Sequence, residues 1–245
     1  MRLIAPPPHP LGPDAPAPEA RTPHPGLGTG GRIWLVRHGQ VHRDWSGRAY
    51  GNGDVPLSPE GEEDTRRLTE ALLTWDVAAL ASSPLLRARC LAETLAQQTG
   101  QDLRLREGLR ELDRGAWQGL AVEEYAGRWA EEAEVYHADP WRWRGHGGES
   151  DEQLTDRAWP VLEELVRAAD GGMAVLVAHF NIIRVLAAKA LGIPAAFSFR
   201  LRNDPGHAML LADAVALPGA GSLWLLERSN VRHPSNAPQP IEDVP

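Results

Sequence analysis

Cysteine is nearly absent from this sequence, since Cys90 is the only one among 245 residues. A single cysteine excludes an intramolecular disulfide and a zinc site built from several thiolates. Cys90 falls in an apolar helical pattern, which indicates a buried and inert thiol. Long apolar runs are also missing, because no stretch approaches the roughly 20 residues that span a bilayer. We therefore expect a soluble protein without disulfide bonds.

Basic side chains are outnumbered, with 25 Lys and Arg residues against 33 Asp and Glu residues. The formal net charge of -8 argues against nucleic acid or an anionic membrane as partner, because both attract clustered Lys and Arg. Any anionic ligand must therefore be held by a local basic pocket. Met1 to Ala5 form too short an apolar run for a signal peptide before the prolines begin, so we expect a cytoplasmic protein.

Proline is concentrated towards the start of the chain. Nine of the 21 prolines lie between Pro6 and Pro25, in a segment with almost no large apolar residues. This composition predicts a disordered, Pro-rich leader over residues 1–30, and a polar, Pro-rich end predicts a flexible tail over residues 233–245. Hydrophobic residues make up 42% of the chain and charged residues 24%, as in ordinary globular proteins. We expect one folded domain over residues 31–232.

Short apolar runs alternate with helical patterns through this domain, which is typical of an α/β fold. We expect a three-layer α/β/α sandwich with a mostly parallel central sheet and helices on both faces. The predicted strands are Ile33–Val36, Ala79–Ala81, Met173–Ala178, Ala208–Ala212 and Leu223–Leu226. The predicted helices include Pro59–Leu73, Val122–Ala133, Glu152–Ala169, one capped by Ser83 that starts at Pro84, and one after His179 that Gly192 closes.

Polar residues follow three of the predicted strands at the point where each strand ends. Arg37 and His38 follow the first strand, Ser82 and Ser83 the second, and His179 a later one. Ligands of open α/β sheets bind beyond the carboxyl ends of the strands. A histidine at a strand end is often a hydrogen-bonded structural residue. Three polar groups at one edge nevertheless favour a binding or catalytic site.

Two charged side chains further along fit a phosphate site. Arg87 lies in the first turn of its predicted helix, where the helix dipole disfavours a cation, so an anionic group close by would offset that cost. Helix starts and arginine forks both bind phosphate. Glu111 is flanked by apolar residues, and partial burial would raise its carboxyl pKa and suit it to donate a proton. The alternatives are a solvated arginine and an exposed loop glutamate.

Four elements occur in an order that resembles the histidine phosphatase superfamily, whose fold is called phosphoglycerate-mutase-like. They are Arg37-His38-Gly39 after the first strand, Arg87 in the second helix, Glu111 ahead of a Gly-x-Trp-x-Gly run, and His179 after a late strand. The segment after the tripeptide also matches, at Arg48, Gly51, Asp54, Pro56, Leu57, Ser58 and Gly61. The likeness covers about Arg32 to Leu226. Gln40-Val41 and Asp44 depart from the family pattern.

This resemblance implies a phosphomonoesterase that hydrolyses small phosphorylated metabolites through a phosphohistidine intermediate, without metal or cofactor. It implies that His38 attacks phosphorus. Arg37, Arg87 and a protonated His179 would offset the charge of the phosphoryl oxygens. Glu111 would protonate the leaving group and then take a proton from the attacking water.

Further contacts with the substrate are expected outside this central set. Arg48 matches a recurring arginine of the family and is expected to bind substrate, and Asn181 starts a helix where its amide can donate to phosphate. Residues 136–150, rich in Gly and Trp, are expected to fold over the pocket and contact the non-phosphate part of the substrate. A surface loop with half-buried tryptophans is the alternative. His137 and His146 in this segment lack the carboxylate or cysteine spacing of a metal site.

Two other functions stay open. A mutase moves phosphate between positions on one substrate, but the stretch from Gly119 to Ala178 looks too short for the cap of such mutases, so the resemblance favours a phosphatase. A catalytically inactive member would bind phosphorylated ligands as a module, which the intact central residues argue against. The oligomeric state is open as well, with a homodimer as one alternative.

Overall fold

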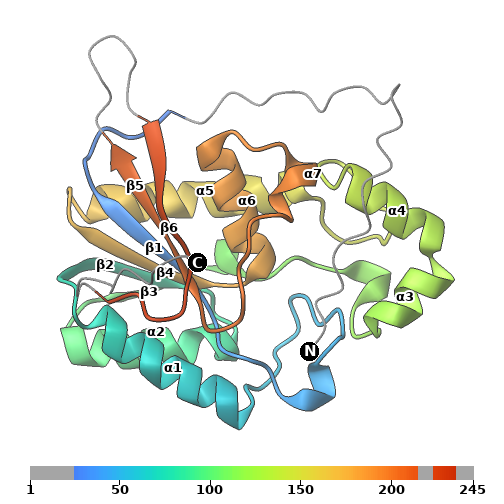
Figure 1. The fold of residues 1–245 in the computed structure, drawn as a ribbon, viewed down its shortest axis with the longest axis horizontal. Coiled ribbons are helices and arrows are strands. Elements are labelled where there is room, and N and C mark those ends of the chain that lie inside the picture. Colours follow the sequence, from blue (N-terminus) through green and yellow to red (C-terminus); the bar gives the residue numbers. More distant parts are fainter. Residues whose placement is uncertain (1–24, 215–222, 236–245) are drawn as a thin grey trace, which may run out of the picture.

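A computed structural model describes residues 25–214 and 223–235, and Figure 1 shows its helices and strands. The strands are β1 (Arg32–Arg37), β2 (Val77–Ser82), β3 (Leu103–Leu105), β4 (Met173–Ala178), β5 (Ala208–Ala214) and β6 (Leu223–Val231). The helices are α1 (Pro59–Leu72), α2 (Leu86–Thr99), α3 (Val122–Arg128), α4 (Ala130–Ala138), α5 (Asp151–Ala168), α6 (Phe180–Leu191) and α7 (Ala195–Ser198). Short 3-10 turns occupy Arg43–Trp45, Glu107–Leu109 and Gly115–Trp117.

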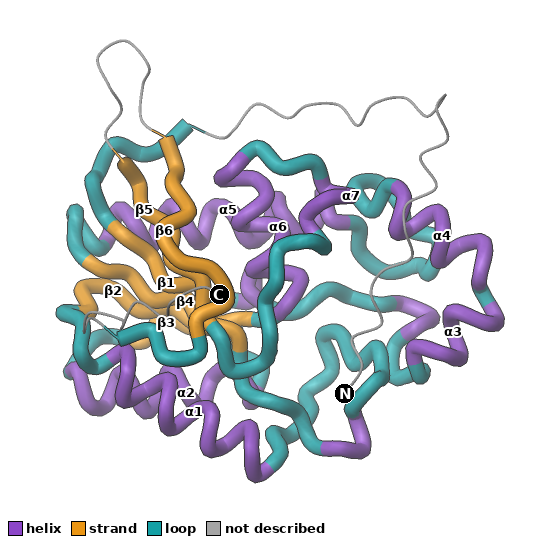
Figure 2. The backbone as a smooth tube through the Cα atoms, viewed as in Figure 1, coloured by secondary structure: helices purple, strands orange, loops and turns teal. Residues whose placement is uncertain are grey.

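The described strands form one sheet in the order β3-β2-β4-β1-β5-β6. β3, β2, β4 and β1 run parallel, whereas β5 is antiparallel to both of its neighbours. Helices α5 and α6 cover one face of the sheet and α1 and α2 cover the other, while α3 and α4 lie beside it (Figures 1 and 2). The predicted three-layer arrangement with a mostly parallel sheet is confirmed.

Two apolar clusters hold the layers together, one on each face of the sheet. Along β1, Ile33 and Leu35 join the cluster under α5 and α6, whereas Trp34 and Val36 join the cluster under α1 and α2. All four side chains are fully buried. Successive side chains of a strand point to opposite faces, so a continuous apolar run is what a strand covered on both faces requires.

The register of the sheet brings three strand ends together. Arg37 at the end of β1 pairs with Ala178 at the end of β4, and Ser82 at the end of β2 pairs with Val177. Just beyond them, the backbone N–H of His38 donates to the Ala178 carbonyl at 3.2 Å. The residues that follow these three parallel strands therefore meet at one edge of the sheet.

Helix α2 begins two residues later than predicted. Its N-cap is Leu85, and the Ser83 N–H donates to the Val177 carbonyl at 3.0 Å, so residue 83 still belongs to the sheet edge. The Ser83 hydroxyl accepts from the Leu85 N–H at 3.3 Å. The prediction that Ser83 caps the helix and Pro84 starts it is therefore wrong, although Arg87 does lie in the first turn.

Two further elements differ from the sequence prediction. The single helix expected over residues 122–133 is two helices, because Trp129 adopts φ -126° and ψ 48° and packs onto an aromatic cluster beside the sheet. Strand β3 was not predicted, since a three-residue edge strand carries too short a pattern to recognise. Cys90 is half-buried rather than buried, and burial raises the pKa of its thiol.

The described part of the domain extends past both predicted boundaries. The backbone N–H groups of Leu27 and Thr29 each donate to the buried Asp213 carboxylate at 2.7 Å. At the other end, the indole N–H of Trp75 donates to the Pro234 carbonyl at 2.7 Å. The rest of the predicted leader and tail, residues 1–24 and 236–245, lies outside the described residues. Among the described helices, none has the length and apolar character needed to cross a membrane.

Candidate active site

Two histidines lie side by side where β1 and β4 end. The ring centroids of His38 and His179 are 5.2 Å apart, and the planes are tilted by 58°. Their exposed fractions are 1% and 0%, so both rings are buried in the protein. The parallel register of the two strands is what brings together residues 141 positions apart in the sequence.

A backbone hydrogen bond places the proton of the His38 ring on Nδ1, which leaves Nε2 unprotonated. Nδ1 lies 2.7 Å from the carbonyl oxygen of Gly39, and since a carbonyl only accepts, Nδ1 must carry the proton. Nε2 is then the acceptor of the Arg87 Nε–H at 3.3 Å. Burial, and then the charges of Arg87 and Arg37, lower the pKa of His38 well below its usual value. The ring is therefore neutral near pH 7, the state in which a histidine can act as a nucleophile.

Gly39 approaches helix α1 too closely for any side chain. A Cβ on Gly39 would lie 2.2 Å from the carbonyl oxygen of Gly61, and a Cβ on Gly61 would lie 2.0 Å from the carbonyl oxygen of Gln40. The Ser58 hydroxyl caps α1 by accepting from the Gly61 N–H at 3.1 Å. These contacts fix the segment after His38 against the start of α1 and explain both glycines of the family pattern.

Arg87 is fully buried in the first turn of α2 and faces His38. Its Nη1 donates to the Gly53 carbonyl at 2.7 Å and its Nη2 to the Gly51 carbonyl at 2.8 Å. Asp54 supplies a negative charge at the same helix start, because its carboxylate accepts from the Leu86 N–H at 2.8 Å. The guanidinium is thus held by the segment that follows His38, with Nε directed at the His38 ring.

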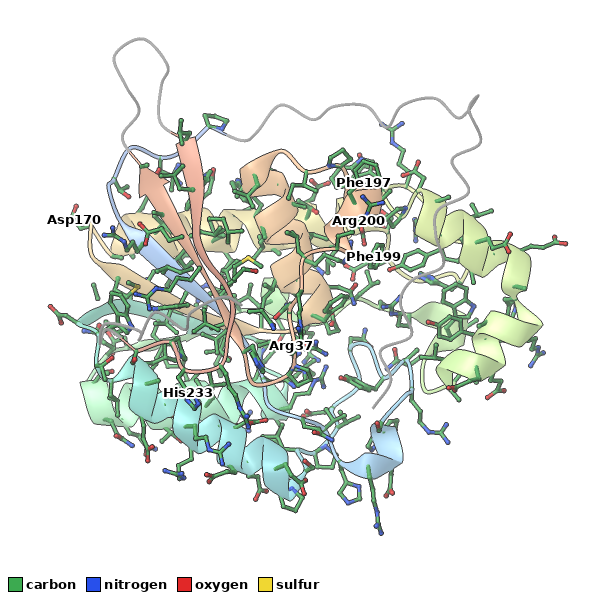
Figure 3. All side chains as sticks on the ribbon, viewed as in Figure 1. Arg37, Asp170, Phe197, Phe199, Arg200 and His233 are labelled. Carbon is green, nitrogen blue, oxygen red and sulfur yellow. The ribbon has the colours of Figure 1, made fainter. Side chains whose placement is uncertain are left out.

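Arg37, which ends β1, lies near the centre of the molecule (Figure 3). Its Nη1 donates to the Asn203 carbonyl, and its guanidinium carbon lies 5.1 Å from the centre of the Phe180 ring. Nε of Arg37 and Nδ2 of Asn203 are buried and lack a hydrogen-bond partner among the described residues. Buried donors without partners are costly, so these two groups are suited to receive an anionic or polar ligand atom.

His179 is held by a neighbour from β2. Its Nε2 lies 2.7 Å from the Ser83 hydroxyl, while its Nδ1 is buried and has no partner in the part of the chain that the structure describes. Burial, followed by the charges of Arg87, a protonated His38 and Arg37, lowers the pKa of His179 well below its usual value. The ring is therefore neutral in the protein on its own, and the protonated ring expected with a phosphoryl group bound stays a prediction. A bound phosphoryl dianion would act in the opposite direction and raise this pKa.

Glu111 is buried beside the start of α6. One carboxylate oxygen accepts from the Leu112 N–H at 2.7 Å, and the other accepts from the Asn181 N–H at 3.2 Å. The Asn181 N–H is one of the unpaired donors at the N-terminus of α6, the helix that His179 caps. The prediction of a buried acid on this loop is confirmed, with an exposed fraction of 6%.

The loop that carries Glu111 is held from behind by Arg157. Its Nη1 donates to the carbonyls of Gly108 and Arg110 at 2.8 Å, and its Nη2 donates to the Glu111 carbonyl at 3.2 Å. Its Nε and Nη2 donate to the Glu149 carboxylate at 2.6 and 2.8 Å. All five N–H groups of this guanidinium are satisfied. No sequence pattern pointed to Arg157 or Glu149, because Arg157 holds the loop through three backbone carbonyls and Glu149 holds Arg157.

Two predicted phosphate contacts have other partners. Arg48 is exposed and donates to the carbonyls of Asp44 and Gly119 at 3.1 and 2.9 Å. The Asn181 side-chain oxygen accepts from the buried Arg184 at 2.9 Å. Arg184 in turn forms two hydrogen bonds, at 2.6 and 2.7 Å, with the buried Asp151. The Asn181 bond uses only its side-chain oxygen and not the amide N–H groups expected to donate to phosphate, so both predicted contacts stay predictions, and the backbone N–H of Asn181 holds Glu111.

Part of the 136–150 segment is attached to the Glu111 loop. The Ala116 N–H donates to the His146 carbonyl at 2.7 Å, and the Glu149 N–H donates to the Asp113 carbonyl at 3.0 Å. Tyr136 and His146 are buried in the aromatic cluster around Trp117. A cavity of about 380 Å³ beside this loop is lined by Glu111, Glu149 and Arg157. Neither His38 nor His179 lines it. Among the described residues, no group of three or more His, Cys, Asp or Glu side chains could hold a metal ion.

Fold and site together define an α/β protein with two neutral, buried histidines between arginines at the carboxyl edge of its sheet. Such a site stabilises a phosphoryl group through positioning and charge. Residues 33–212 match the histidine phosphatase superfamily (branch 1), and the chain belongs to this superfamily.

Individual relatives carry names from two activities. This chain is 36% identical to the glucosyl-3-phosphoglycerate phosphatase of Mycolicibacterium vanbaalenii over 170 residues. The aligned region covers 66% of this chain and 75% of that protein. This chain is also 31% identical to the probable phosphoglycerate mutase GpmB of Salmonella choleraesuis over 175 residues. That alignment covers 70% of this chain and 80% of the relative. The solved structure of a mycobacterial glucosyl-3-phosphoglycerate phosphatase is similar, with a TM-score of 0.70 at 28% identity, covering 82% of this chain and 98% of that one.

Proposed function

We propose that this chain is a metal-independent phosphomonoesterase that hydrolyses small phosphorylated metabolites through a phosphohistidine on Nε2 of His38. The observation that carries the proposal is the state of that ring. The Gly39 carbonyl fixes the proton on Nδ1, and the lone pair of Nε2 faces Arg87 at 3.3 Å. A neutral imidazole with its unprotonated nitrogen against a guanidinium suits attack on an anionic phosphoryl group.

In the first step, His38 Nε2 forms a bond to phosphorus and the bond between phosphorus and the ester oxygen breaks. Glu111 gives its proton to that leaving oxygen. In the second step, a water oxygen attacks phosphorus while Glu111 takes a proton from the water, and the Nε2–phosphorus bond breaks. Inorganic phosphate leaves, and His38 and Glu111 return to their starting states.

The charge on the phosphoryl oxygens is offset by three groups. Arg37 and Arg87 are permanently charged, and neither has a carboxylate within salt-bridge distance among the described residues. His179 takes up a proton as the dianion binds, because the anion counters the burial and the neighbouring charges that keep the free ring neutral. The unpartnered Nδ1 of His179 is the atom suited to donate to the phosphoryl group.

A mutase is the second candidate, because one relative is named a probable phosphoglycerate mutase. Both activities share the phosphohistidine step, and they differ in whether water or a second hydroxyl receives the phosphoryl group. Two relatives carry phosphoglycerate compounds in their names, which supports a small phosphorylated metabolite as the substrate here. We further propose that the enzyme works in the cytoplasm, where such metabolites are formed, and a homodimer stays an alternative that sedimentation would test.

The test is phosphate release from a panel of small phosphomonoesters in the presence of EDTA. We expect release by the wild type and none above background by His38→Ala. Exposed His233, which lies apart from Arg37 in Figure 3, provides a matched control, and His233→Ala should release phosphate as the wild type does. Loss of activity with EDTA, or full activity in His38→Ala, would contradict the proposal. Transfer of phosphate between positions without release would establish the mutase.

A further inference from the structure

Gln118 joins the loop that carries Glu111 to the segment that follows His38. Its backbone closes a short 3-10 turn on the Glu111 loop, with the Gln118 N–H donating to the Gly115 carbonyl at 3.0 Å. Its side chain reaches across to the other segment, where Nε2 donates to the Tyr50 carbonyl. One side chain therefore links the part of the chain that supplies the acid to the part that follows the reacting histidine.

The Tyr50 carbonyl belongs to a turn that holds Arg87. The same carbonyl accepts from the Gly53 N–H at 2.9 Å, which closes the turn. Two further carbonyls of the turn, those of Gly51 and Gly53, accept from the two terminal nitrogens of the Arg87 guanidinium at 2.8 and 2.7 Å. Arg87 Nε then donates to Nε2 of His38 at 3.3 Å. The turn therefore sets where the guanidinium lies relative to the His38 ring.

The Gln118 amide fits closely against this turn. A Cβ on Gly53 would lie 2.9 Å from Gln118 Nε2, and a Cβ on Gly51 would collide with Gln118 Oε1. Gly51 also has a φ of 44°, a left-handed conformation that favours glycine. The amide cannot be reversed, because Oε1 would then face the carbonyl oxygen of Tyr50 and both atoms are acceptors. Its Nε2 is therefore fixed as the donor to the turn.

The other end of the same amide has no hydrogen bond. Gln118 Oε1 is buried and lacks a hydrogen-bond partner in the part of the chain that the structure describes. A buried acceptor without a partner lowers stability, and an apolar side chain of the same length would avoid that cost. Stability alone therefore does not account for a glutamine here, whereas the bond from Nε2 to the turn beside Arg87 does.

We propose that Gln118 is a positioning residue for Arg87, which it holds in place through the turn. This inference rests on the proposed phosphatase function. Three of the five N–H groups of Arg87 donate to the two turn carbonyls and to the His38 ring, which leaves two for phosphoryl oxygens. Because a guanidinium is planar and rigid, the three bonded N–H groups decide the direction of the other two. A turn released from Gln118 would leave Arg87 charged but misdirected.

The experiment removes the amide and keeps the length of the side chain, in Gln118→Met. Direction matters most in the transition state, so we expect kcat to fall by about 10- to 100-fold and KM to change by less than about threefold. The Ki of orthovanadate, which mimics the transferring phosphoryl group, should rise by about tenfold, and the Ki of inorganic phosphate should rise less. The urea midpoint of unfolding should not fall, because the variant has no unpaired Oε1.

A second variant and a control complete the design. Gln118→Asn keeps the amide but is one methylene shorter, so it should not reach the Tyr50 carbonyl and should show the same split between kcat and KM. Gln98→Met, at an exposed position on α2, is the matched control and should behave as the wild type.

The outcomes separate this inference from the function on which it rests. No hydrolysis of any phosphomonoester by the wild type would contradict the phosphatase itself. Wild-type kcat in either Gln118 variant, or an unchanged Ki of orthovanadate, would overturn the positioning role. A lower urea midpoint in Gln118→Met would show that the side chain serves stability instead.

Discussion

The hydroxyl of Ser83 lies 2.7 Å from Nε2 of His179, and this bond joins the end of β2 to the residue after β4. A hydroxyl can donate to a bare ring nitrogen or accept from a protonated one. Ser83 can therefore stay bonded to His179 both before and after the ring takes up a proton. Its oxygen also accepts from the Leu85 N–H at 3.3 Å, which holds the hydroxyl in place.

We expect Ser83→Ala to lower kcat by about 10- to 100-fold with a much smaller change in KM, since an unpaired buried N–H costs about 1–3 kcal/mol. Loss of the hydrogen bond to the hydroxyl destabilises the protonated His179 ring more than the neutral ring. The pKa of His179 in the substrate complex should fall, and the alkaline limb of the pH–kcat profile should move to lower pH. Ser83→Thr, which keeps the hydroxyl, should restore both. An unmoved alkaline limb in Ser83→Ala would count against this role.

The stability of the protein should decrease in mild acid. Burial, and then Arg114, lower the pKa of His146 to about 4, and burial lowers the pKa of His38 and of His179 well below 6.5. In the unfolded chain these rings titrate near 6.5. Below that pH the unfolded state therefore binds more protons than the folded state, which lowers the free energy of unfolding. Each ring contributes about 1.4 kcal/mol of lost stability per pH unit, down to its folded pKa.

Urea unfolding at about pH 7.5 and about pH 5 measures this effect. We expect a lower midpoint at the acidic pH, and a smaller drop in His146→Gln, whose side-chain oxygen can replace Nδ1 as acceptor of the Gly148 N–H. The same drop in variant and wild type would show that His146 is not a source of the acid sensitivity.

Arg157→Lys should lower kcat by about tenfold while KM for phosphomonoesters changes little, because a misplaced acid costs rate more than binding. Lysine keeps the charge but cannot reach the three loop carbonyls and Glu149 together. Glu149→Gln should cause a smaller loss in the same direction. The exposed pair of Arg106 and Glu164 provides the control, and Arg106→Lys should behave as the wild type. An Arg157→Lys enzyme with wild-type kcat would exclude a positioning role for this clamp.

Asp213→Ala should detach the segment before β1. Its buried carboxylate accepts from the N–H groups of Leu27, Gly28 and Thr29 and from the Thr29 hydroxyl at 2.6 to 3.1 Å. We expect a loss of about 1–3 kcal/mol in unfolding free energy and faster proteolysis near Gly28. Asp213→Asn, which keeps one acceptor oxygen, should be intermediate. Equal cleavage rates in wild type and Asp213→Ala would contradict this anchoring.

Local patterns were sufficient for most of the fold. Strand β4 has the predicted bounds because its six residues are all apolar and are covered on both faces. Helix α1 begins at Pro59 as predicted, since Ser58 and Pro59 form a cap and first residue that need no tertiary contact. The start of α2 was mispredicted from the same kind of signal, because a sheet hydrogen bond to Ser83 competes with the cap.

The site residues also fall into a group that local patterns indicated and a group that only tertiary contacts revealed. His38, Arg87, Glu111 and His179 could be named as candidates because each stands at a strand end, at a helix start or among apolar neighbours. The expected phosphate contacts of Arg48 and Asn181 stay predictions, and the sequence did not indicate their bonds to carbonyls and to Arg184. Arg157 and Gln118 were missed, because a hydrogen bond to a distant backbone carbonyl leaves no local pattern.

The sequence by itself determined the alternation of strands and helices, the apolar faces and the residue types available for phosphate chemistry, because these follow from periodicity and from each side chain's own properties. Only the tertiary structure decided which nitrogen of His38 is free, that His179 is neutral in the free protein, and that Gln118 bonds the turn that holds Arg87. Protonation and hydrogen bonding depend on burial and on atoms a few ångströms away, and those neighbours come from distant parts of the chain.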